Sequence, residues 1–228
     1  DMYAADHIRR VLQTFPGVFS GIGEFTIHKE FVSAKVAGDV ASLIDPAVDR
    51  IFEFCGESGL VAIMHNDIQM PFVKQEAKRF YFKQAKALLA RHPDATIIWA
   101  HTGLGRVVQP VSEHLNMIEE ILADPTLQHV YFDISWSEVA KYVVATPRAT
   151  ELTAALLEKY PDRFLMGSDN VALTDPEASF AVFEQYRPLW DSLTPETSRK
   201  VRKENFARLF DTAAKKVRAW EKANPAPN

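Results

Sequence analysis

Five short apolar runs alternate along the chain with longer segments of helical pattern, and this alternation limits the possible folds most. The runs are rich in β-branched and aromatic residues and mostly lack a period of two, as is typical of strands buried on both faces of a parallel sheet. They are Val18–Phe25, Leu60–Met64, Thr96–Ala100, Val130–Ile134 and Phe164–Met166. The alternation predicts an α/β fold with a parallel sheet.

Helix signals fill the intervals between these runs. Asp45 and Pro46 place an N-cap residue before a proline at the first helical position, and Gly59 can end that helix. The other predicted helices cover Gln75–Ala90, Pro110–Ala123 and Thr150–Tyr160, and a last one opens at Thr194-Pro195 and runs towards Phe210. Each strand and its following helix therefore form one βα unit of similar length.

Composition limits the class of protein and the kinds of partner that we expect. The chain has 228 residues and a formal net charge of −4. We predict one domain over residues 1–222 and a disordered tail over 223–228. Without a basic excess, we expect no nucleic-acid partner. No apolar run approaches the roughly 18 residues that span a bilayer, so we expect no membrane partner either. A small-molecule substrate and a homo-oligomer remain compatible with this composition.

The single cysteine, Cys55, falls on the apolar face of a predicted helix, so we expect a buried small hydrophobe there. This is compatible with a reducing compartment, and we expect a cytoplasmic location. Because the first residue is Asp1 rather than Met, the sequence neither shows nor excludes a signal peptide.

A charged or metal-competent residue stands at the carboxyl end of each apolar run. These residues are Glu24, His65, His101, Asp133 and Asp169, separated by 32 to 41 residues. A parallel barrel brings all of its strand carboxyl ends to one face, so residues far apart in sequence can converge there. Two imidazoles with one or two carboxylates suit Zn²⁺ or a similar divalent ion. Such an ion makes hydroxide available by lowering the pKa of a bound water, and a carboxylate such as Asp169 can hold that water and take its proton.

Structural explanations compete with this hypothesis. A single histidine at a strand end is often only a satisfied polar residue, and Asp133 fits a helix cap as well as it fits support of a ligand. The remaining histidines divide by position: His92 and His129 precede strands, His7 and His114 lie in helical patterns, and His28 follows Glu24 in a long loop. We predict structural or surface roles for the first four, while His28 could line a pocket.

Six short motifs follow one another between residues 18 and 210. They are Gly21-Ile22-Gly23-Glu24-Phe25, Met64-His65-Asn66-Asp67, Trp99-Ala100-His101-Thr102-Gly103, Tyr131-Phe132-Asp133-Ile134-Ser135, Arg163-Phe164-Leu165-Met166-Gly167-Ser168-Asp169 and Glu204-Asn205-Phe206-Ala207-Arg208-Leu209-Phe210. In this order and spacing they resemble the amidohydrolase superfamily, most closely its amidohydrolase-2 branch. The resemblance implies a metal-dependent, TIM-like (β/α)₈ barrel, of which this chain represents strands four to eight.

The resemblance also implies roles for the strand-end residues. His65, on strand five, would be a metal ligand, and His101, on strand six, a ligand of a second metal or a catalytic base and electrophile. Asp169, on strand eight, would be a metal ligand and proton shuttle. Glu24 falls on strand four, where some relatives place a metal-bridging carboxylate and others a modified lysine. Positions flanking the site imply substrate contacts for Thr102, Arg106, Ser168 and Asn170.

One motif of the family is absent from the sequence. The family opens with a His-x-His pair on strand one, and this chain contains no such pair. A full barrel typically needs about 250 residues, so three βα units of about 36 residues each are expected ahead of Asp1. We therefore expect the chain to be the C-terminal part of a longer protein.

Several functions remain open at this stage. The first is a metal-dependent hydrolase that uses a metal-bound hydroxide on an amide, ester or lactone, with one or two divalent ions, Zn²⁺ being the expected one. A non-oxidative decarboxylase of the same superfamily is the alternative, with His101 protonating the carbanion and Arg106 as candidate carboxylate binder. A non-catalytic α/β ligand-binding module or an inactive barrel scaffold would also fit the fold. A dinucleotide is disfavoured, because Gly21-x-Gly23 continues to Thr26 rather than to a glycine.

Overall fold

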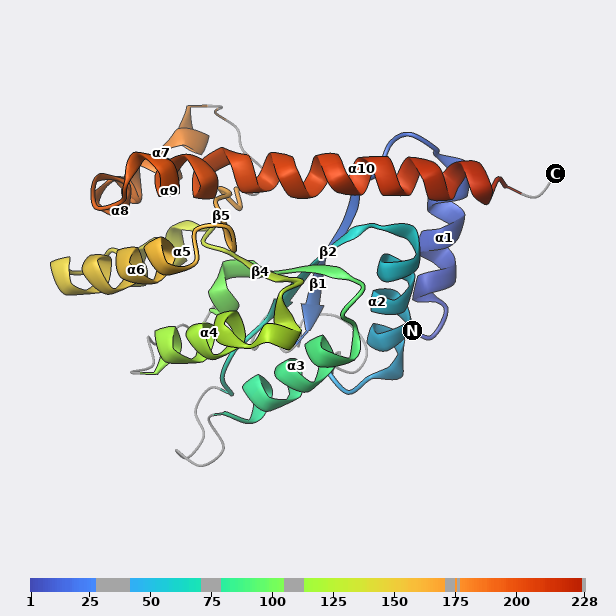
Figure 1. The fold of residues 1–228 in the computed structure, drawn as a ribbon, viewed down its shortest axis with the longest axis horizontal. Helices are drawn as coiled ribbons and strands as arrows, with labels where there is room; N and C mark the ends of the chain where they lie inside the picture. Colours follow the sequence, from blue (N-terminus) through green and yellow to red (C-terminus); the bar gives the residue numbers. More distant parts are fainter. Residues whose placement is uncertain (28–41, 71–78, 105–112, 171–174, 176, 227–228) are drawn as a thin grey trace.

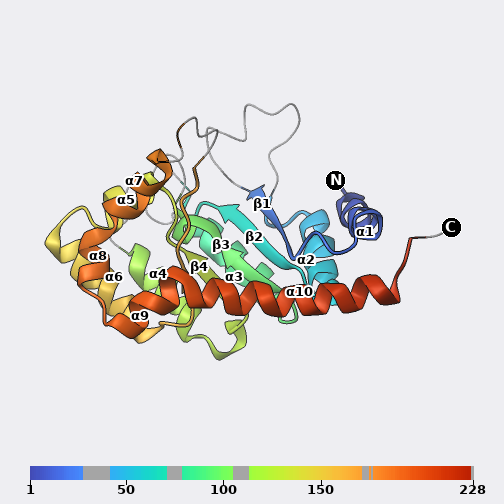
Figure 2. The ribbon, with the colours of Figure 1, turned by 90° about the horizontal axis from the view of Figure 1, so that it is seen from above.

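Five parallel strands form one sheet in the order β1-β2-β3-β4-β5. The computed structural model describes residues 1–27, 42–70, 79–104, 113–170, 175 and 177–226. The strands are β1 (Gly21–Ile27), β2 (Val61–Asn66), β3 (Thr96–Trp99), β4 (Val130–Asp133) and β5 (Phe164–Leu165). Their order along the sheet follows their order in the sequence, as Figure 2 shows for β1 to β4. The predicted α/β fold with a parallel sheet is therefore confirmed, although β1 begins at Gly21 rather than Val18.

Helices occupy the intervals between strands, as the alternation predicted. They are α1 (Ala4–Thr14), α2 (Pro46–Ser58), α3 (Phe80–Arg91), α4 (His114–Ala123), α5 (Ser137–Val143), α6 (Pro147–Lys159), α7 (Ala178–Gln185), α8 (Arg187–Asp191), α9 (Pro195–Arg199) and α10 (Asn205–Ala223). A π-helical turn over Lys200–Glu204 joins α9 to α10. The predicted helix from Gln75 is described only from its later part, since residues 71–78 lie outside the described segments. Helices α5, α7 and α8 were not expected from the sequence, whereas α1 covers the helical pattern that contains His7.

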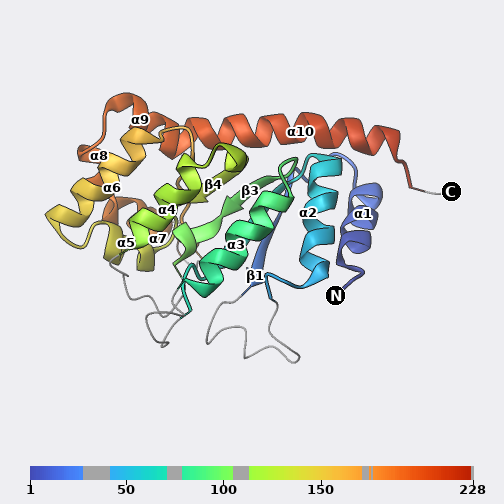
Figure 3. The same ribbon diagram turned by 60° about the horizontal axis from the view of Figure 1, so that its bottom comes forward.

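The sheet is covered on both faces. Helices α2, α3 and α4 lie along one face, and α10 crosses the other (Figures 1 and 3). Leu209 and Ala213 of α10 pack with Val61, Ile98 and Leu165 of the sheet in one buried cluster. Strand residues alternate between faces, because successive side chains in a strand point to opposite sides. The interior of the sheet is largely apolar, with Glu24 in the middle of β1 as an exception.

An aromatic ladder joins the last three strands on the face that packs against the α2–α4 layer. Trp99, Phe132 and Phe164 are register partners on β3, β4 and β5. Their ring centroids are 5.8 and 6.0 Å apart, and all three side chains are buried. This ladder fixes the relative positions of three strands whose carboxyl ends lead to His101, Asp133 and Asp169.

Helix α2 begins and ends at the residues that the sequence indicated. The Asp45 carboxylate accepts a hydrogen bond from the Ala47 N–H, and Pro46 occupies the first helical position. The helix ends at Gly59, which has a left-handed backbone with φ 81°. Cys55 of this helix is buried in the main core. That core includes residues from Ala5 of α1 to Trp220 of α10.

We expect Gly59→Ala to destabilise the protein more than Gly17→Ala. Both glycines have a positive φ, which costs an L-residue about 1–2 kcal/mol. An added Cβ at Gly59 would lie 2.4 Å from Cβ of Lys216, whereas one at Gly17 would have no neighbour within 4 Å. Overpacking should add at least about 1 kcal/mol at Gly59. Urea unfolding of the two variants measures this difference, and equal losses would show that the contact with α10 is unimportant.

The predicted domain over residues 1–222 and the predicted disordered tail over 223–228 stay predictions. Helix α10 ends at Ala223, where the tail was predicted to begin, and residues 227–228 lie outside the described part. Within the described residues, no helix has the length and apolar character that crossing a membrane requires.

Candidate metal centre

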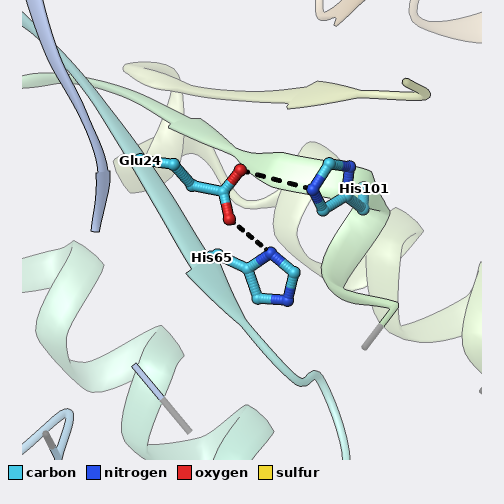
Figure 4. Close-up of side chains that lie close together, drawn as sticks. All are labelled: Glu24, His65 and His101. Atoms are coloured by element: carbon cyan, nitrogen blue, oxygen red, sulfur yellow. Dashed lines mark ion pairs between the residues drawn. The ribbon is translucent and has the colours of Figure 1, made fainter. Parts of the chain in front are cut away.

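Three side chains from neighbouring strands meet towards the carboxyl edge of the sheet. His65 lies near the end of β2 and His101 two residues after β3, but Glu24 lies in the middle of β1 rather than at its carboxyl end as predicted, because β1 continues to Ile27. Glu24 Oε1 is 2.6 Å from His65 Nδ1, and Glu24 Oε2 is 3.4 Å from His101 Nε2 (Figure 4). One potential ligand atom from each residue lies within 4.8 Å of the other two. The parallel sheet thus brings together residues that are distant in the sequence.

Burial and charge suit this cluster to a cation. The side chains of His65 and His101 are 1% and 2% exposed, and that of Glu24 is 27% exposed. Burial tends to raise the pKa of Glu24, but its contacts with His101 and His65 outweigh this effect and hold the pKa well below its usual range. Within the described residues, the buried Nε2 atom of His101 has no hydrogen-bond partner of normal geometry. An anionic carboxylate therefore faces a buried nitrogen that a metal ion would satisfy.

Asp169 lies near the same ring nitrogen of His101 that Glu24 faces. Its Oδ2 atom is 3.7 Å from His101 Nε2, and its side chain is 30% exposed. It does not belong to the group of three described residues whose potential ligand atoms all lie within 4.8 Å of one another. This position, in contact with His101 and partly open to solvent, suits a residue that accepts and releases protons. Its predicted role as a metal ligand stays a prediction.

Left-handed backbone conformations shape the strand ends. The non-glycine residues with positive φ in the described part of the chain all follow β3, β4 or β5: His101 (56°), Thr102 (52°), Trp136 (85°) and Asp169 (50°). Such conformations are unfavourable for L-residues and tend to occur at functional sites. Here they turn the chain at the carboxyl edge, where His101 belongs to the cluster and Asp169 lies beside it.

A second group of polar residues lies behind His101. The Asp133 carboxylate oxygen Oδ1 accepts hydrogen bonds from the backbone N–H groups of His101 and Ser135, both at 3.0 Å, and from the Ser135 hydroxyl. Ser135 Oγ is in turn 2.9 Å from His101 Nδ1. The indole of Trp136 packs against the imidazole of His101, with 5.2 Å between ring centroids. Asp133 therefore supports the predicted site residue His101.

Sequence reasoning assigned no role to two of the polar residues found here. Ser135 belonged to a quoted motif only, and Asp67, whose Oδ1 is 4.0 Å from His65 Nε2, was not considered as a site residue. The available signal for Ser135 was its place in the sequence, two residues after Asp133 in the motif that follows the fourth apolar run.

The predicted substrate contacts fall at different places. The Thr102 side chain is buried, and its hydroxyl donates to the carbonyl of His101 at 2.7 Å. Asn170 is half-buried beside Asp169, and its N–H donates to Ser168 Oγ at 3.4 Å. Arg106 and His28 lie outside the described residues. Substrate binding by Thr102, Asn170 and Arg106 stays a prediction.

His114, predicted to be structural or at the surface, is buried beneath the loop that carries His101. Its Nε2 atom lies 2.8 Å from the Thr102 carbonyl oxygen, so the neutral imidazole donates a hydrogen bond there. Burial lowers the pKa of His114 to about 4, although this hydrogen bond acts in the opposite direction. His114 thereby helps to hold the left-handed residues His101 and Thr102 in place.

We expect His114 to make the protein less stable in mild acid. Between pH 6.5, its ordinary pKa, and about 4, the unfolded chain binds a proton that the folded protein excludes. The free energy of unfolding therefore falls as pH decreases through this window, by about 3 kcal/mol in total. His114→Gln can keep the N–H donor without the titration. Urea unfolding of both proteins between pH 7 and 4 should give a shallower slope for the variant, and identical slopes would refute this assignment.

A cavity of about 260 Å³ adjoins the cluster. Its polar wall contains Glu24, His101, Asp133, Ser135 and Asp169. Its apolar wall contains Ile63, Ile98, Leu165, Met166, Phe206 and Phe210. The stacked rings of Phe206 and Phe210, 4.4 Å apart, come from α10. The site therefore combines titratable groups with an apolar wall, in a cavity that can hold a small molecule.

The sequence matches the amidohydrolase family model over residues 7–212, which include all five strands and the cluster. The chain belongs to the amidohydrolase family. No curated protein matches the sequence. Among solved structures, this amidohydrolase is similar to a dihydroorotase from Campylobacter jejuni, with 11% identity and a TM-score of 0.60 over 92% of this chain and 63% of that one. The chain thus spans less than two thirds of that protein.

Two further solved structures are similar. A zinc-bound amidohydrolase from Burkholderia multivorans is 14% identical, with a TM-score of 0.57 over 92% of this chain and 71% of that chain. A 2,6-dihydroxybenzoate decarboxylase from Rhizobium is 13% identical, with a TM-score of 0.53 over 91% and 67%. These likenesses concern the fold, and they confirm that the parallel sheet corresponds to part of a TIM-like barrel.

Proposed function

We propose that this amidohydrolase is a metal-dependent hydrolase acting on an amide, ester or lactone bond of a small molecule. The observation that carries the proposal is the convergence of Glu24, His65 and His101 on one point at the carboxyl edge of the sheet. In barrels of this kind the active site is built at that edge. Two imidazoles and a carboxylate fit a divalent ion, and we propose zinc because its borderline character suits nitrogen and oxygen donors together.

Each residue would have a distinct part in the reaction. A bound divalent ion supplies a Lewis acid and lowers the pKa of water towards 7. Glu24 provides the negative charge that offsets part of the charge of the cation. Asp169, beside His101 and partly exposed, would accept a proton from the attacking water and return it to the leaving group. The apolar wall of the cavity would hold the substrate and exclude bulk water from the reacting bond.

A non-oxidative decarboxylation is the second candidate, and the charge around His101 favours it. Burial lowers the pKa of His101, but Glu24, Asp133 and Asp169 outweigh burial and raise it above its ordinary value. A protonated imidazole at this edge of the cavity could donate its proton to a carbanion left by the loss of CO₂. The resemblance to a decarboxylase concerns the fold, so the two reactions must be separated by their products.

Chelation should abolish the activity. We expect turnover of a panel of small amides, esters, lactones and hydroxybenzoates to fall at least about 100-fold in dipicolinate, and to recover when zinc is added to the dialysed protein. Release of acid without CO₂ would identify the hydrolase, and release of CO₂ the decarboxylase. Substrate binding without turnover, unaffected by chelator, would instead identify a ligand-binding module and contradict the proposal.

A further inference from the structure

We infer that Asp133 and Ser135 form a positioning pair that fixes the ring of His101 in its Nδ1-protonated tautomer. This pair would keep the Nε2 lone pair directed at the Glu24 and Asp169 side of the cavity. The inference deepens the proposed function. It rests on that function only for the metal ion that Nε2 would bind. The tautomer itself follows from the hydrogen bonds behind the ring.

The Oδ1 oxygen of Asp133 accepts every hydrogen bond that it makes here. It accepts from two backbone N–H groups, those of His101 and Ser135, each at 3.0 Å. A proton on this oxygen would collide with both donors, so Oδ1 can act only as an acceptor. The Ser135 hydroxyl lies in hydrogen-bond contact with the same oxygen. The hydrogen in this contact must therefore come from Ser135.

The hydroxyl of Ser135 lies between Asp133 and His101 and contacts both. A serine hydroxyl has one hydrogen and two acceptor lone pairs. Since that hydrogen is directed to Asp133, Ser135 Oγ can only accept from His101 Nδ1, which lies 2.9 Å away. His101 Nδ1 must therefore carry a hydrogen. In a neutral imidazole the other nitrogen, Nε2, then has a free lone pair.

The other ring nitrogen of His101, Nε2, faces two carboxylates. Nε2 lies 3.4 Å from Glu24 Oε2 and 3.7 Å from Asp169 Oδ2. Ser135 is buried, and Gly167 at the end of β5 approaches it closely, since an added Cβ there would lie 3.3 Å from Ser135 Cβ. The ring is thus held from behind by buried groups and presents a basic nitrogen to the site. Such outer hydrogen bonds typically change metal affinity 10- to 100-fold.

Nitrogen NMR of the metal-free protein tests the tautomer directly. With ¹⁵N-labelled histidine, long-range ¹H–¹⁵N spectra at alkaline pH should show His101, assigned with His101→Gln, as the Nδ1–H tautomer. Asp133→Asn retains an acceptor oxygen and should keep this pattern. Asp133→Ala frees the serine hydrogen and should admit the Nε2–H tautomer. Ser135→Ala, which leaves the Asp133 contacts with both N–H groups in place, should also lose the single-tautomer pattern.

Zinc affinity provides the second measurement. Ser135→Ala should weaken zinc binding 10- to 100-fold, while Asp133→Asn should weaken it less. An Nε2–H tautomer in the unmodified protein, or an unchanged spectrum in Ser135→Ala, would overturn the inference. If the tautomer is as stated but the protein binds no zinc, the proposed function fails and the positioning pair stands. If Asp133→Ala does not fold, Ser135→Ala decides the question.

Discussion

Replacing Asp169 by asparagine should lower kcat by about 10²- to 10⁴-fold, the usual contribution of a positioned acid–base group. The amide of asparagine has nearly the shape of the carboxylate but cannot carry the proton. Because Asp169 lies outside the cluster of Glu24, His65 and His101, the bound metal should change little. Turnover and metal content of the same preparation, measured with p-nitrophenyl acetate as an ester probe, separate these two effects.

Asp175→Asn is the matched control for this change. Asp175 lies on the same segment after β5, is exposed, and accepts a hydrogen bond from the Glu177 N–H. Asp175→Asn should leave kcat within about twofold of the unmodified protein, because the Asp175 side chain is exposed and its hydrogen bond is with the Glu177 N–H. Full activity in Asp169→Asn would refute the assigned proton transfer. Loss of the metal in that variant would instead make Asp169 a ligand.

The second large effect is on the stability of the sheet rather than on the reaction. Phe132→Ala should reduce the free energy of unfolding by about 3–5 kcal/mol, because a fully buried aromatic ring is replaced by a cavity. Phe132 stacks between Trp99 and Phe164, so its loss also loosens the three strands that lead to the site. Urea unfolding followed by tryptophan fluorescence measures this change.

Phe206→Ala removes the same side chain from an exposed position. Phe206 is 54% exposed and stacks on Phe210 at the edge of α10. We expect Phe206→Ala to reduce the free energy of unfolding by about 1 kcal/mol or less, because one aromatic pair contributes an amount of this size. If the two substitutions were equally destabilising, the aromatic ladder would not be a major source of stability in the sheet.

The strands and the strand-end residues were predictable because their signals are local. Short apolar runs that are followed by His65, His101 and Asp169 indicate buried parallel strands with polar residues at their ends. Parallel strands bring their carboxyl ends to the same edge of the sheet. The start and end of α2 were predictable for the same reason, since Asp45, Pro46 and Gly59 act within one turn of the helix.

Other features depend on contacts that no local pattern encodes. His101 and Thr102 adopt left-handed conformations without being glycines, and they are held by Asp133 and His114 from distant parts of the chain. Likewise, the amphipathic pattern of α10 predicts a buried stripe but not the face of the sheet that it covers. Such tertiary contacts, rather than propensity, determine the fine geometry of the site.

Calorimetric titration of zinc into the metal-free protein tests the metal centre most directly. We predict one or two ions per chain, and a decrease in affinity of at least about 100-fold when Glu24, His65 or His101 is replaced by Gln, Asn and Asn respectively. His7→Asn, a change at an exposed histidine on α1, should bind zinc as the unmodified protein does. Undiminished stoichiometry and affinity in all three site variants would contradict the assignment of a metal to this edge of the sheet.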